Sequence, residues 1–324
     1  MTKAIVVSQT GGPEVLKFDN VEVGEPGEGE VRISHTAIGL NYIDVYFRTG
    51  LYPPPSLPFT PGMEGAGIVE AVGDSVSDLT IGDRVAYAGP IGSYSEERNI
   101  AADRLVKVPD SIDDETAAGM MLQGMTARYL LRETFRVQRG HTILFHAAAG
   151  GVGLIAGQWA KALGATVIGT AGSEEKIELA EANGYDHVIN YREDDFVERV
   201  KEITDGKGCD AVYDSVGKDT FPGSLDCLKP RGTWASFGQS SGPLPEVNLG
   251  ILAQKGSLFA TRPTLFNYIA SPEELKANAA ELFQVVANNQ VKIAVNQQYT
   301  LADAEQAHRD LEARKTVGST ILLP

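Results

Sequence analysis

Short apolar runs separated by turn-forming residues fill the first third of the chain. Clusters of Gly, Pro and Asp divide the runs, which lie at 3–8, 30–40, 65–73 and 83–88. Strands joined by turns give this pattern. Residues 1 to about 120 are therefore predicted to be β-rich. The proline-dense stretch 49–62 is predicted to be a stiff loop at the surface or at a cleft edge, or a plain connector.

The hydrophobic period becomes helical at residue 113. Residues 113–135 are rich in Ala, Leu and Met, which predicts a mostly buried helical stretch. Beyond it, apolar runs alternate with helical patterns as far as residue 261. The six runs lie at 142–147, 165–170, 186–191, 209–217, 232–238 and 256–261. Such alternation predicts a doubly wound parallel sheet.

The C-terminal part begins with a helix signal. Ser271 is predicted to cap a helix that starts at Pro272, with Glu274 closing a capping box. Further elements are predicted after this helix: a strand at 291–300, a helix at 301–315 and a last strand at 318–324.

The order of these patterns predicts two domains. A length of 324 residues agrees with that number, since a domain has roughly 150 residues. β-rich segments lie on both sides of the alternating region, so we predict a nucleotide domain inserted into a second domain. The expected boundaries are 1–122 and 265–324 for the outer domain, and 123–264 for the inserted one.

Charge and cysteine content narrow the function. A net charge of −15 disfavours binding to nucleic-acid phosphates or anionic membranes. Cys209 and Cys227 are the only cysteines, which excludes a disulfide framework and a four-cysteine zinc site. They suggest packed thiols in a reducing cytoplasm. No apolar run reaches about 18 residues, so neither a membrane span nor a signal peptide is expected.

A glycine-rich turn follows the first strand of the alternating region. Residues 148–153 fit the spacing G-x-G-x-x-G, with Ala148 in the first place. Glycine lets the backbone approach a pyrophosphate, and the free N–H groups of the following helix bind it. We predict dinucleotide binding at Gly150, Gly151, Val152 and Gly153. A tight turn without a ligand is the alternative.

The second strand of this region lacks the acidic residue that normally binds the ribose of NAD. Such a carboxylate would repel the 2′-phosphate of NADPH by at most roughly 4 kcal/mol at about 4 Å. Residues near this strand end offer donors instead: Gly172, Ser173, Lys176 and Tyr191. The sequence therefore favours NADPH, provided that Glu174 and Glu175 point away. If either acid reaches the ribose, NAD is favoured.

Zinc alcohol dehydrogenases share this layout, so a catalytic zinc is a further possibility. Zinc needs Cys, His or carboxylate ligands in tetrahedral reach, but Asn41 and Met63 stand where ligands would be expected. The five histidines lack ligand spacing: His35, His141, His146, His187 and His308. His146 lies beside the glycine turn and is better explained as a core or loop residue. No metal site is predicted.

With these features assembled, the chain resembles the zinc-independent quinone oxidoreductases of the medium-chain dehydrogenase/reductase superfamily. The resemblance covers essentially the whole chain, and its longest stretches are 41–58, 145–165, 247–263 and 318–324. It implies a GroES-like catalytic domain built from both chain ends, with an inserted Rossmann domain that binds NADPH. It also implies a homodimer whose Rossmann sheets meet edge to edge.

The resemblance also implies cofactor contacts. Asn41, Asp44 and Tyr46 match positions near the nicotinamide, and Gly151 and Val152 match the pyrophosphate site. The 2′-phosphate positions are Ser173, Lys176 and Tyr191. Further implied contacts are Tyr129, Ser215, Phe237, Gly238, Ser240, Phe259, Thr261, Arg262 and Val317.

The implied activity is hydride transfer from NADPH to a quinone. Tyr46 and Asn41 are the candidate donors to the oxygen that gains negative charge. Tyr46 as a pocket wall and Asp44 as a loop-holding residue are alternatives. A reductase of activated alkenes, such as 2-alkenals, would use the same cofactor. A low-turnover NADPH-binding protein with a structural or RNA-binding role is a further alternative, and the negative charge counts against RNA.

Overall fold

The computed structural model describes all 324 residues, which divide into two compact units. Unit 1 comprises residues 1–125, 269–283 and 293–324, and unit 2 comprises 126–268 and 284–292. The domain boundaries expected from the sequence stay a prediction, because compactness and independent folding are different properties.

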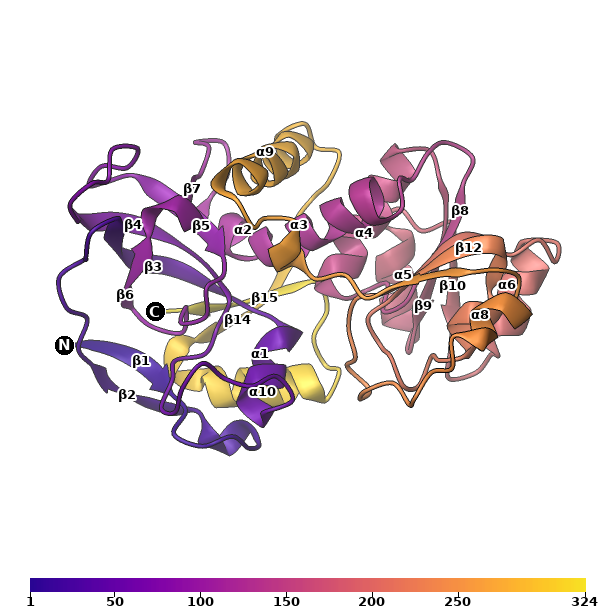
Figure 1. The fold of residues 1–324 in the computed structure, drawn as a ribbon, viewed down its shortest axis with the longest axis horizontal. Helices are drawn as coiled ribbons and strands as arrows, with labels where there is room; N and C mark the ends of the chain where they lie inside the picture. Colours follow the sequence, from indigo (N-terminus) through magenta and orange to yellow (C-terminus); the bar gives the residue numbers. More distant parts are fainter. The chain divides into compact units, whose positions relative to one another are not determined.

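Unit 1 is built on a seven-stranded sheet. Its strands are β3 (Glu30–Leu40), β4 (Glu64–Val72), β5 (Arg84–Ala88), β6 (Glu97–Ala101), β7 (Val106–Lys107), β14 (Val295–Thr300) and β15 (Ser319–Leu323). The order is β14-β15-β3-β4-β5-β7, with β6 also on β3. Because β15 pairs antiparallel with β3, the C-terminal segment completes the N-terminal sheet, as Figure 1 shows. Strands β1 (Thr2–Val6) and β2 (Lys17–Val21) pair with each other.

The helices of this part confirm some predictions and correct others. They are α1 (Tyr42–Thr49), α2 (Asp114–Ala118), α3 (Met121–Tyr129), α9 (Pro272–Ala287) and α10 (Ala304–Glu312), and the last residues of α3 and α9 belong to unit 2. The capping box of α9 is confirmed, since Ser271 N donates to Glu274 Oε2 at 3.0 Å and Glu274 N donates to Ser271 Oγ at 3.2 Å. The sequence did not predict α1. The strand expected from residue 291 begins at Val295.

The sheet of unit 2 confirms the predicted doubly wound architecture. Its strands are β8 (Thr142–Phe145), β9 (Thr166–Ala171), β10 (His187–Asn190), β11 (Cys209–Asp214), β12 (Leu228–Ser236) and β13 (Phe259–Thr261). All neighbouring pairs are parallel, in the order β10-β9-β8-β11-β12-β13. This is the strand order of the Rossmann fold.

Helices connect the strands of unit 2. The helices are α4 (Gly151–Ala162), α5 (Glu174–Glu181), α6 (Phe196–Ile203), α7 (Gly223–Asp226) and α8 (Gly250–Gln254). A π-helical turn at Leu130–Thr134 continues α3, and a 3-10 turn lies at Leu265–Asn267. Three further 3-10 turns belong to unit 1, at Pro13–Val15, Ala102–Arg104 and Leu301–Asp303. No helix combines the length and the apolar character that crossing a membrane requires.

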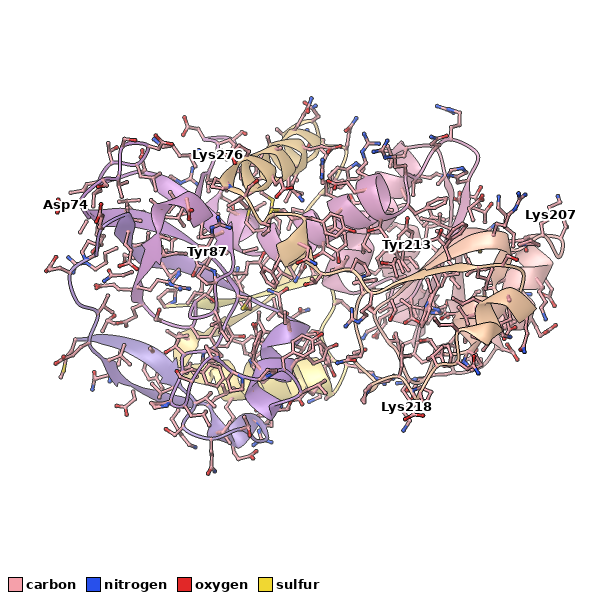
Figure 2. All side chains as sticks on the ribbon, in the orientation of Figure 1. Asp74, Tyr87, Lys207, Tyr213, Lys218 and Lys276 are labelled. Atoms are coloured by element: carbon pink, nitrogen blue, oxygen red, sulfur yellow. The ribbon has the colours of Figure 1, made fainter.

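Each unit has its own apolar core. Tyr87 of β5 and Tyr213 of β11 are fully buried, while Lys207 and Lys276 project from the surface in Figure 2. The stretch 113–135 is confirmed as core, since its three methionines are 0% exposed. The two cysteines are buried thiols, as predicted.

Candidate active site

The glycine turn joins β8 to α4 in unit 2. Gly150 is the N-cap of α4, and Ala147 occupies the left-handed region with a φ of 55°. A Cβ on Gly153 would lie 2.4 Å from the carbonyl oxygen of Ala147 and 2.5 Å from that of Ala148. Only glycine lets the helix start this close to the turn. The first turn of α4 thereby presents unsatisfied backbone N–H groups at a tight loop, which suits an anionic ligand.

The end of β9 gathers the residues predicted to bind a 2′-phosphate. Parallel pairing places Asn190 of β10 beside Ala171, and the Tyr191 hydroxyl lies against Gly172, where a Cβ would be 2.5 Å from that oxygen. Ser173 is the N-cap of α5, but its side chain makes no capping hydrogen bond. This arrangement leaves a serine hydroxyl and a helix N-terminus together at one strand end.

Two acids and one lysine lie near this strand end. Glu174 and Glu175 are exposed on the first turn of α5, and Lys176 is half-buried on the same helix. That the two acids point away from the ribose, as the preference for NADPH requires, stays a prediction.

A buried polar network lies behind the glycine turn. The Ser224 hydroxyl donates to Asp214 Oδ2 at 2.8 Å, and His146 Nε2 lies 3.0 Å from Ser224 Oγ. Since the one serine proton is committed to the carboxylate, Nε2–H must donate to Ser224. His146 Nδ1, 3.1 Å from Thr170 Oγ1, then accepts from that hydroxyl. Burial lowers the pKa of His146 and keeps it neutral. His146 is thus confirmed as a core residue.

Asp214 organises the loops that follow β11 and β12. Burial acts to raise the pKa of Asp214, but the surrounding N–H and O–H donors hold that pKa below its usual value. Its Oδ1 accepts from the backbone N–H groups of Val216 and Gly217. A Cβ on Gly238 would lie 2.6 Å from the carbonyl oxygen of Ser215, so the two loops are in close contact.

Other predicted cofactor residues of unit 2 lie on or near these loops. Phe237 N donates to the Asp214 carbonyl, and Ser240 N donates to that of Ser215. Arg262 Nη1 donates to the Ser236 carbonyl at 3.0 Å, which places it beside the end of β12.

Two predicted aromatic residues of unit 2 differ in exposure. Tyr129 is buried and stacks on Tyr268 with ring centroids 4.3 Å apart, and burial raises its pKa. Phe259 begins β13, one of the two edge strands, and is 62% exposed, with Thr261 at the end of that strand. The cofactor contacts of these residues stay predictions.

In unit 1, Asn41 and Asp44 stand at the start of α1. Asn41 is the N-cap of the helix, and its backbone N–H donates to Asp44 Oδ2 at 2.9 Å. The Tyr94 hydroxyl donates to the same carboxylate oxygen at 3.0 Å, while the other oxygen, Oδ1, is buried without a hydrogen-bond partner. Burial raises the pKa of Asp44 to about 7. These contacts fit the alternative in which Asp44 holds the loop.

The Asn41 side chain contacts a second buried acid, Glu64 of β4. Asn41 Nδ2 lies 2.6 Å from Glu64 Oε2, and Leu122 N donates to Glu64 Oε1 at 2.8 Å. Burial raises the pKa of Glu64 to about 8, with a contribution from nearby Asp44. Gln123 Nε2 lies 3.2 Å from Asn41 Oδ1, so the asparagine amide is held at both ends.

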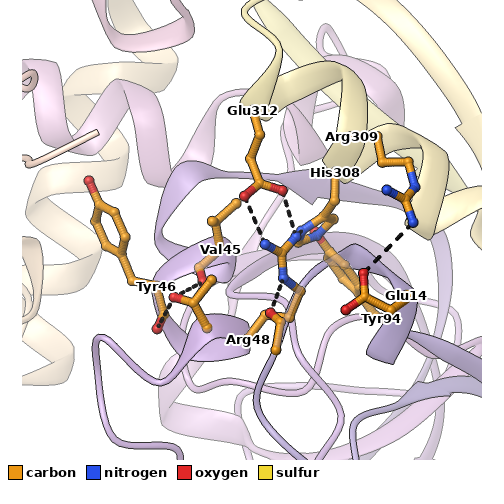
Figure 3. A network of polar contacts seen from close by, with 10 residues as sticks. Glu14, Val45, Tyr46, Arg48, Tyr94, His308, Arg309 and Glu312 are labelled. Carbon is orange, nitrogen blue, oxygen red and sulfur yellow. Dashed lines mark hydrogen bonds and ion pairs between the residues drawn. The ribbon is translucent and has the colours of Figure 1, made fainter. Parts of the chain in front are cut away.

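Figure 3 shows a polar cluster around Arg48, which includes Tyr94, the donor to Asp44. The buried Arg48 guanidinium donates to both oxygens of Glu312 at 2.8 Å and lies 3.0 Å from His308 Nδ1. His308 Nε2 lies 3.1 Å from the Tyr94 hydroxyl. Burial, then Arg48, lowers the pKa of His308 to about 3. Since the hydroxyl proton goes to Asp44, a neutral His308 with a proton on Nε2 satisfies both neighbours.

Tyr46 and Val317 are the remaining predicted residues of unit 1. The Tyr46 ring points away from the Arg48 cluster in Figure 3 and packs between Tyr42 and Tyr52, with centroids 5.5 and 5.1 Å away. Val317 is half-buried just before β15. Their predicted roles remain untested.

The donor set does not fit a catalytic zinc. No three side chains among His, Cys, Asp and Glu are grouped so that they would hold a metal ion. Asn41 and Met63 are buried in unit 1, and neither is a residue type that zinc prefers.

Most of the buried polar groups in both units have no signal in the sequence. Among these groups Glu64 has the clearest signal in the sequence, because its charge interrupts the apolar run at 63–69. Asp214 carried a similar signal at the end of an apolar strand. The remaining partners are brought together only by the fold: Arg48, Tyr94, Gln123, Thr170, Ser224, His308 and Ser319.

Family comparisons agree with this architecture. Residues 27–110 match the alcohol dehydrogenase GroES-like domain, and residues 151–284 match the domain described as zinc-binding dehydrogenase. The first match confirms the predicted GroES-like character of the outer domain.

Individual relatives match over the full length. The chain is 55% identical to a quinone oxidoreductase of Pseudomonas aeruginosa, covering 100% of both chains. The crystal structure of Escherichia coli quinone oxidoreductase complexed with NADPH superposes with a TM-score of 0.98 at 52% identity, covering 99% of this chain and 100% of that one. A 2-haloacrylate reductase of a Burkholderia species is 46% identical, covering 100% of this chain and 99% of the relative.

Proposed function

We propose that this chain, which belongs to the quinone oxidoreductase family of the medium-chain dehydrogenase/reductase superfamily, reduces quinones with NADPH. The observation that carries the proposal is the full-length match, at a TM-score of 0.98, to a quinone oxidoreductase complexed with NADPH. The glycine turn and the strand end beside it supply an independent argument, because their chemistry suits that cofactor.

The residues of unit 2 fit the phosphates of NADPH. The start of α4 at Gly150 and Gly151 would hold the pyrophosphate through backbone N–H groups. Ser173, Lys176 and Tyr191 would hold the 2′-phosphate, and the uncapped Ser173 hydroxyl is suitably placed for it. Charge-assisted hydrogen bonds contribute about 1.5–3 kcal/mol each. Two of them would favour NADPH over NADH by about a hundredfold or more.

Unit 1 would supply the groups that act on the substrate. When bound, NADPH supplies a hydride, and the quinone oxygen that is reduced becomes an anion. We assign to the Asn41 amide and the Tyr46 hydroxyl the task of donating hydrogen bonds to that oxygen. Water then protonates the anion, so the reaction needs no dedicated acid.

Reduction of activated alkenes is the second candidate. It is favoured by the 46% identity to a 2-haloacrylate reductase. An alkene acceptor places the developing charge next to a carbon that must be protonated. Positioned proton donors would therefore matter more for alkenes than for quinones.

Three further properties belong to the same proposal. The protein acts as a homodimer in the cytoplasm, and its Rossmann sheets meet at the β13 edge. The outer domain spans 1–122 and 265–324, and the nucleotide domain spans 123–264. The exposed Phe259 on this edge strand supports the dimer edge, and the two buried free cysteines are compatible with a reducing compartment.

A kinetic comparison tests the activity and the phosphate site together. NADPH and NADH oxidation would be followed with 1,4-benzoquinone and with a 2-alkenal as acceptors. We expect turnover that favours NADPH and the quinone. Lys176→Ala should raise the KM for NADPH by about tenfold or more with little change in kcat, since it removes a charged partner of the phosphate.

Lys207→Ala is the matched control, because Lys207 is a highly exposed lysine of the same unit. Equal use of NADH and NADPH, with Lys176→Ala silent, would refute the phosphate site. Faster turnover of the alkenal would favour the second candidate. Tight NADPH binding without turnover on either acceptor would refute the enzymatic proposal.

A further inference from the structure

Four buried polar side chains form a continuous chain in unit 1. They run from Glu64 on β4 through Asn41 and Gln123 to Ser319 on β15, and none is more than 6% exposed. The separations are 2.6 Å from Glu64 Oε2 to Asn41 Nδ2, 3.2 Å from Asn41 Oδ1 to Gln123 Nε2, and 2.7 Å from Gln123 Oε1 to Ser319 Oγ. Each amide is therefore held between two polar neighbours.

Ser319, the last residue of this hydrogen-bonded series, fixes the direction of its hydrogen bonds. Ser319 Oγ lies 2.6 Å from the carbonyl oxygen of Gly119 and 2.7 Å from Gln123 Oε1. Both neighbours are acceptors, but a hydroxyl has only one proton. The carbonyl can only accept, so the serine proton belongs to Gly119. The Gln123 amide must then turn end for end and donate its N–H to Ser319.

The orientation of the Gln123 amide determines the orientation of the Asn41 amide, which in turn determines the protonation of Glu64. With its oxygen turned toward Asn41, Gln123 needs a donor, so the Asn41 amide turns as well and donates its N–H. The Asn41 oxygen then faces Glu64, which must carry a proton to donate. The separation of 2.6 Å at this contact matches an O–H donor, and is short for an N–H donor.

We propose that Glu64 is a neutral carboxylic acid that positions Asn41, donating to the asparagine oxygen at the head of a chain that ends on the Gly119 carbonyl. The proposal rests on the proposed function, in which Asn41 binds the substrate oxygen. With its oxygen and one N–H engaged, the amide keeps one N–H in a fixed orientation for the substrate. Glu64, Gln123 and Ser319 are positioning residues and do not touch the substrate.

The surroundings of Glu64 favour the protonated form. The side chain is 0% exposed, and burial, aided by Asp44 of α1, raises its pKa to about 8. The other titratable groups near it are the hydroxyls of Tyr87 on β5 and of Tyr94, whose pKa values burial also raises. Gly39 of β3 leaves room for the carboxyl group, since a Cβ there would lie 2.3 Å from Glu64 Oε2.

Ionisation of Glu64 would break the chain at Asn41, because the Gly119 carbonyl still fixes its Ser319 end. A carboxylate can only accept, so Asn41 would have to turn its amide nitrogen toward Glu64. The amide would then present a different edge to the substrate. The kcat of the wild-type protein should therefore fall as the pH rises past about 8, because the orientation that serves the reaction is lost.

Isosteric substitution provides the test. Gln at position 64 can accept from Leu122 N with its oxygen and donate to Asn41 with its amide, as the neutral acid does. We expect Glu64→Gln to keep kcat within about threefold of wild type at about pH 7, and to abolish the alkaline fall. Glu64→Leu should lower kcat by about tenfold or more. Glu70→Gln, an exposed acid on the same strand, controls for charge.

An activity-independent measurement accompanies the kinetics. Infrared difference spectra against Glu64→Gln should contain the carbonyl band of a protonated carboxylic acid, which disappears as the pH is raised past about 8. Loss of kcat in Glu64→Gln to the level of Glu64→Leu would overturn the proposal, as would absence of the band. If wild type does not reduce quinones at all, the proposed function fails, while the infrared result still decides the protonation of Glu64.

Discussion

His35 illustrates how burial fixes the charge of single residues in this protein. Its Nδ1 lies 2.7 Å from the Ser95 carbonyl and its Nε2 lies 2.7 Å from the Tyr87 hydroxyl. Because the carbonyl only accepts, Nδ1 carries the proton and Nε2 accepts from the tyrosine. Burial, with Arg98 adding to it, lowers the pKa of His35 to about 3. The residue is therefore neutral in the folded state and holds two strands together.

The stabilising effect of His35 should depend on pH. A folded pKa below the unfolded value of about 6.5 gives stability that is complete above pH 6.5 and is lost as the pH falls toward 3. His35→Asn should lower the free energy of unfolding by about 2 kcal/mol at pH 8. At pH 5 the difference in free energy of unfolding between wild type and His35→Asn should be smaller by about 2 kcal/mol, as measured by denaturant unfolding.

The exposed His187 supplies the control for this prediction. His187→Asn should leave the free energy of unfolding nearly unchanged at both pH values, since surface substitutions have small effects. A difference in free energy of unfolding between wild type and His35→Asn that stays constant from pH 8 to about pH 5 would contradict the neutral state of His35.

At the scale of elements, the sequence predicted the features that depend on residues a few positions apart. The capping box at Ser271 and Glu274 was readable because its partners are three residues apart. Helix α1 was not predicted, because its eight residues contain an arginine and an aspartate that are buried by contacts from distant segments. Its Arg48 donates to Glu312 of α10, and no pattern in the neighbouring sequence predicts that pair.

The start of helix α4 allows a prediction about NADPH binding at the scale of elements. Gly153→Ala would place a Cβ within 2.5 Å of two backbone carbonyl oxygens of the glycine turn, so the helix start must shift. We expect the Kd for NADPH to rise by about tenfold or more, because the N–H groups at the helix start move away from the pyrophosphate. Calorimetric titration measures it.

Gly24→Ala is the matched control, since a Cβ at Gly24 has nothing within 4 Å. This variant should bind NADPH as wild type does. Unchanged affinity in Gly153→Ala, with the fold intact by circular dichroism, would show that the close packing of the turn is not needed for binding.

At the scale of the whole molecule, the proposed dimer depends on one exposed edge. Strand β13 ends the sheet of unit 2 with three residues, and an exposed edge strand presents unpaired N–H and C=O groups to another chain. Phe259→Glu would place two like charges near each other at a two-fold edge. We expect the mass measured by sedimentation to fall from dimer to monomer.

Ile81→Glu, at an apolar position of unit 1 that is 70% exposed, should leave the mass unchanged. A monomeric wild type would contradict the dimer itself. A dimer that survives Phe259→Glu would move the interface away from β13.

The sequence by itself determined the features that depend on short-range patterns. Hydrophobic periodicity indicated the six parallel strands, the glycine spacing indicated the turn at 148–153, and the order of patterns indicated an inserted domain. Small residues at 172–173, in place of an acid, indicated the cofactor preference. Each of these signals is local, because backbone hydrogen bonding and side-chain alternation act over a few residues.

Only the tertiary structure decided which polar side chains share a buried site. Ser319 lies 196 positions from Gln123, and His308 lies 260 positions from Arg48. Their partners were unrecognisable in the sequence because a polar residue shows its environment only after the chain has buried it. Burial also sets the protonation of Glu64, since the cost of a charge depends on the solvent that the fold removes.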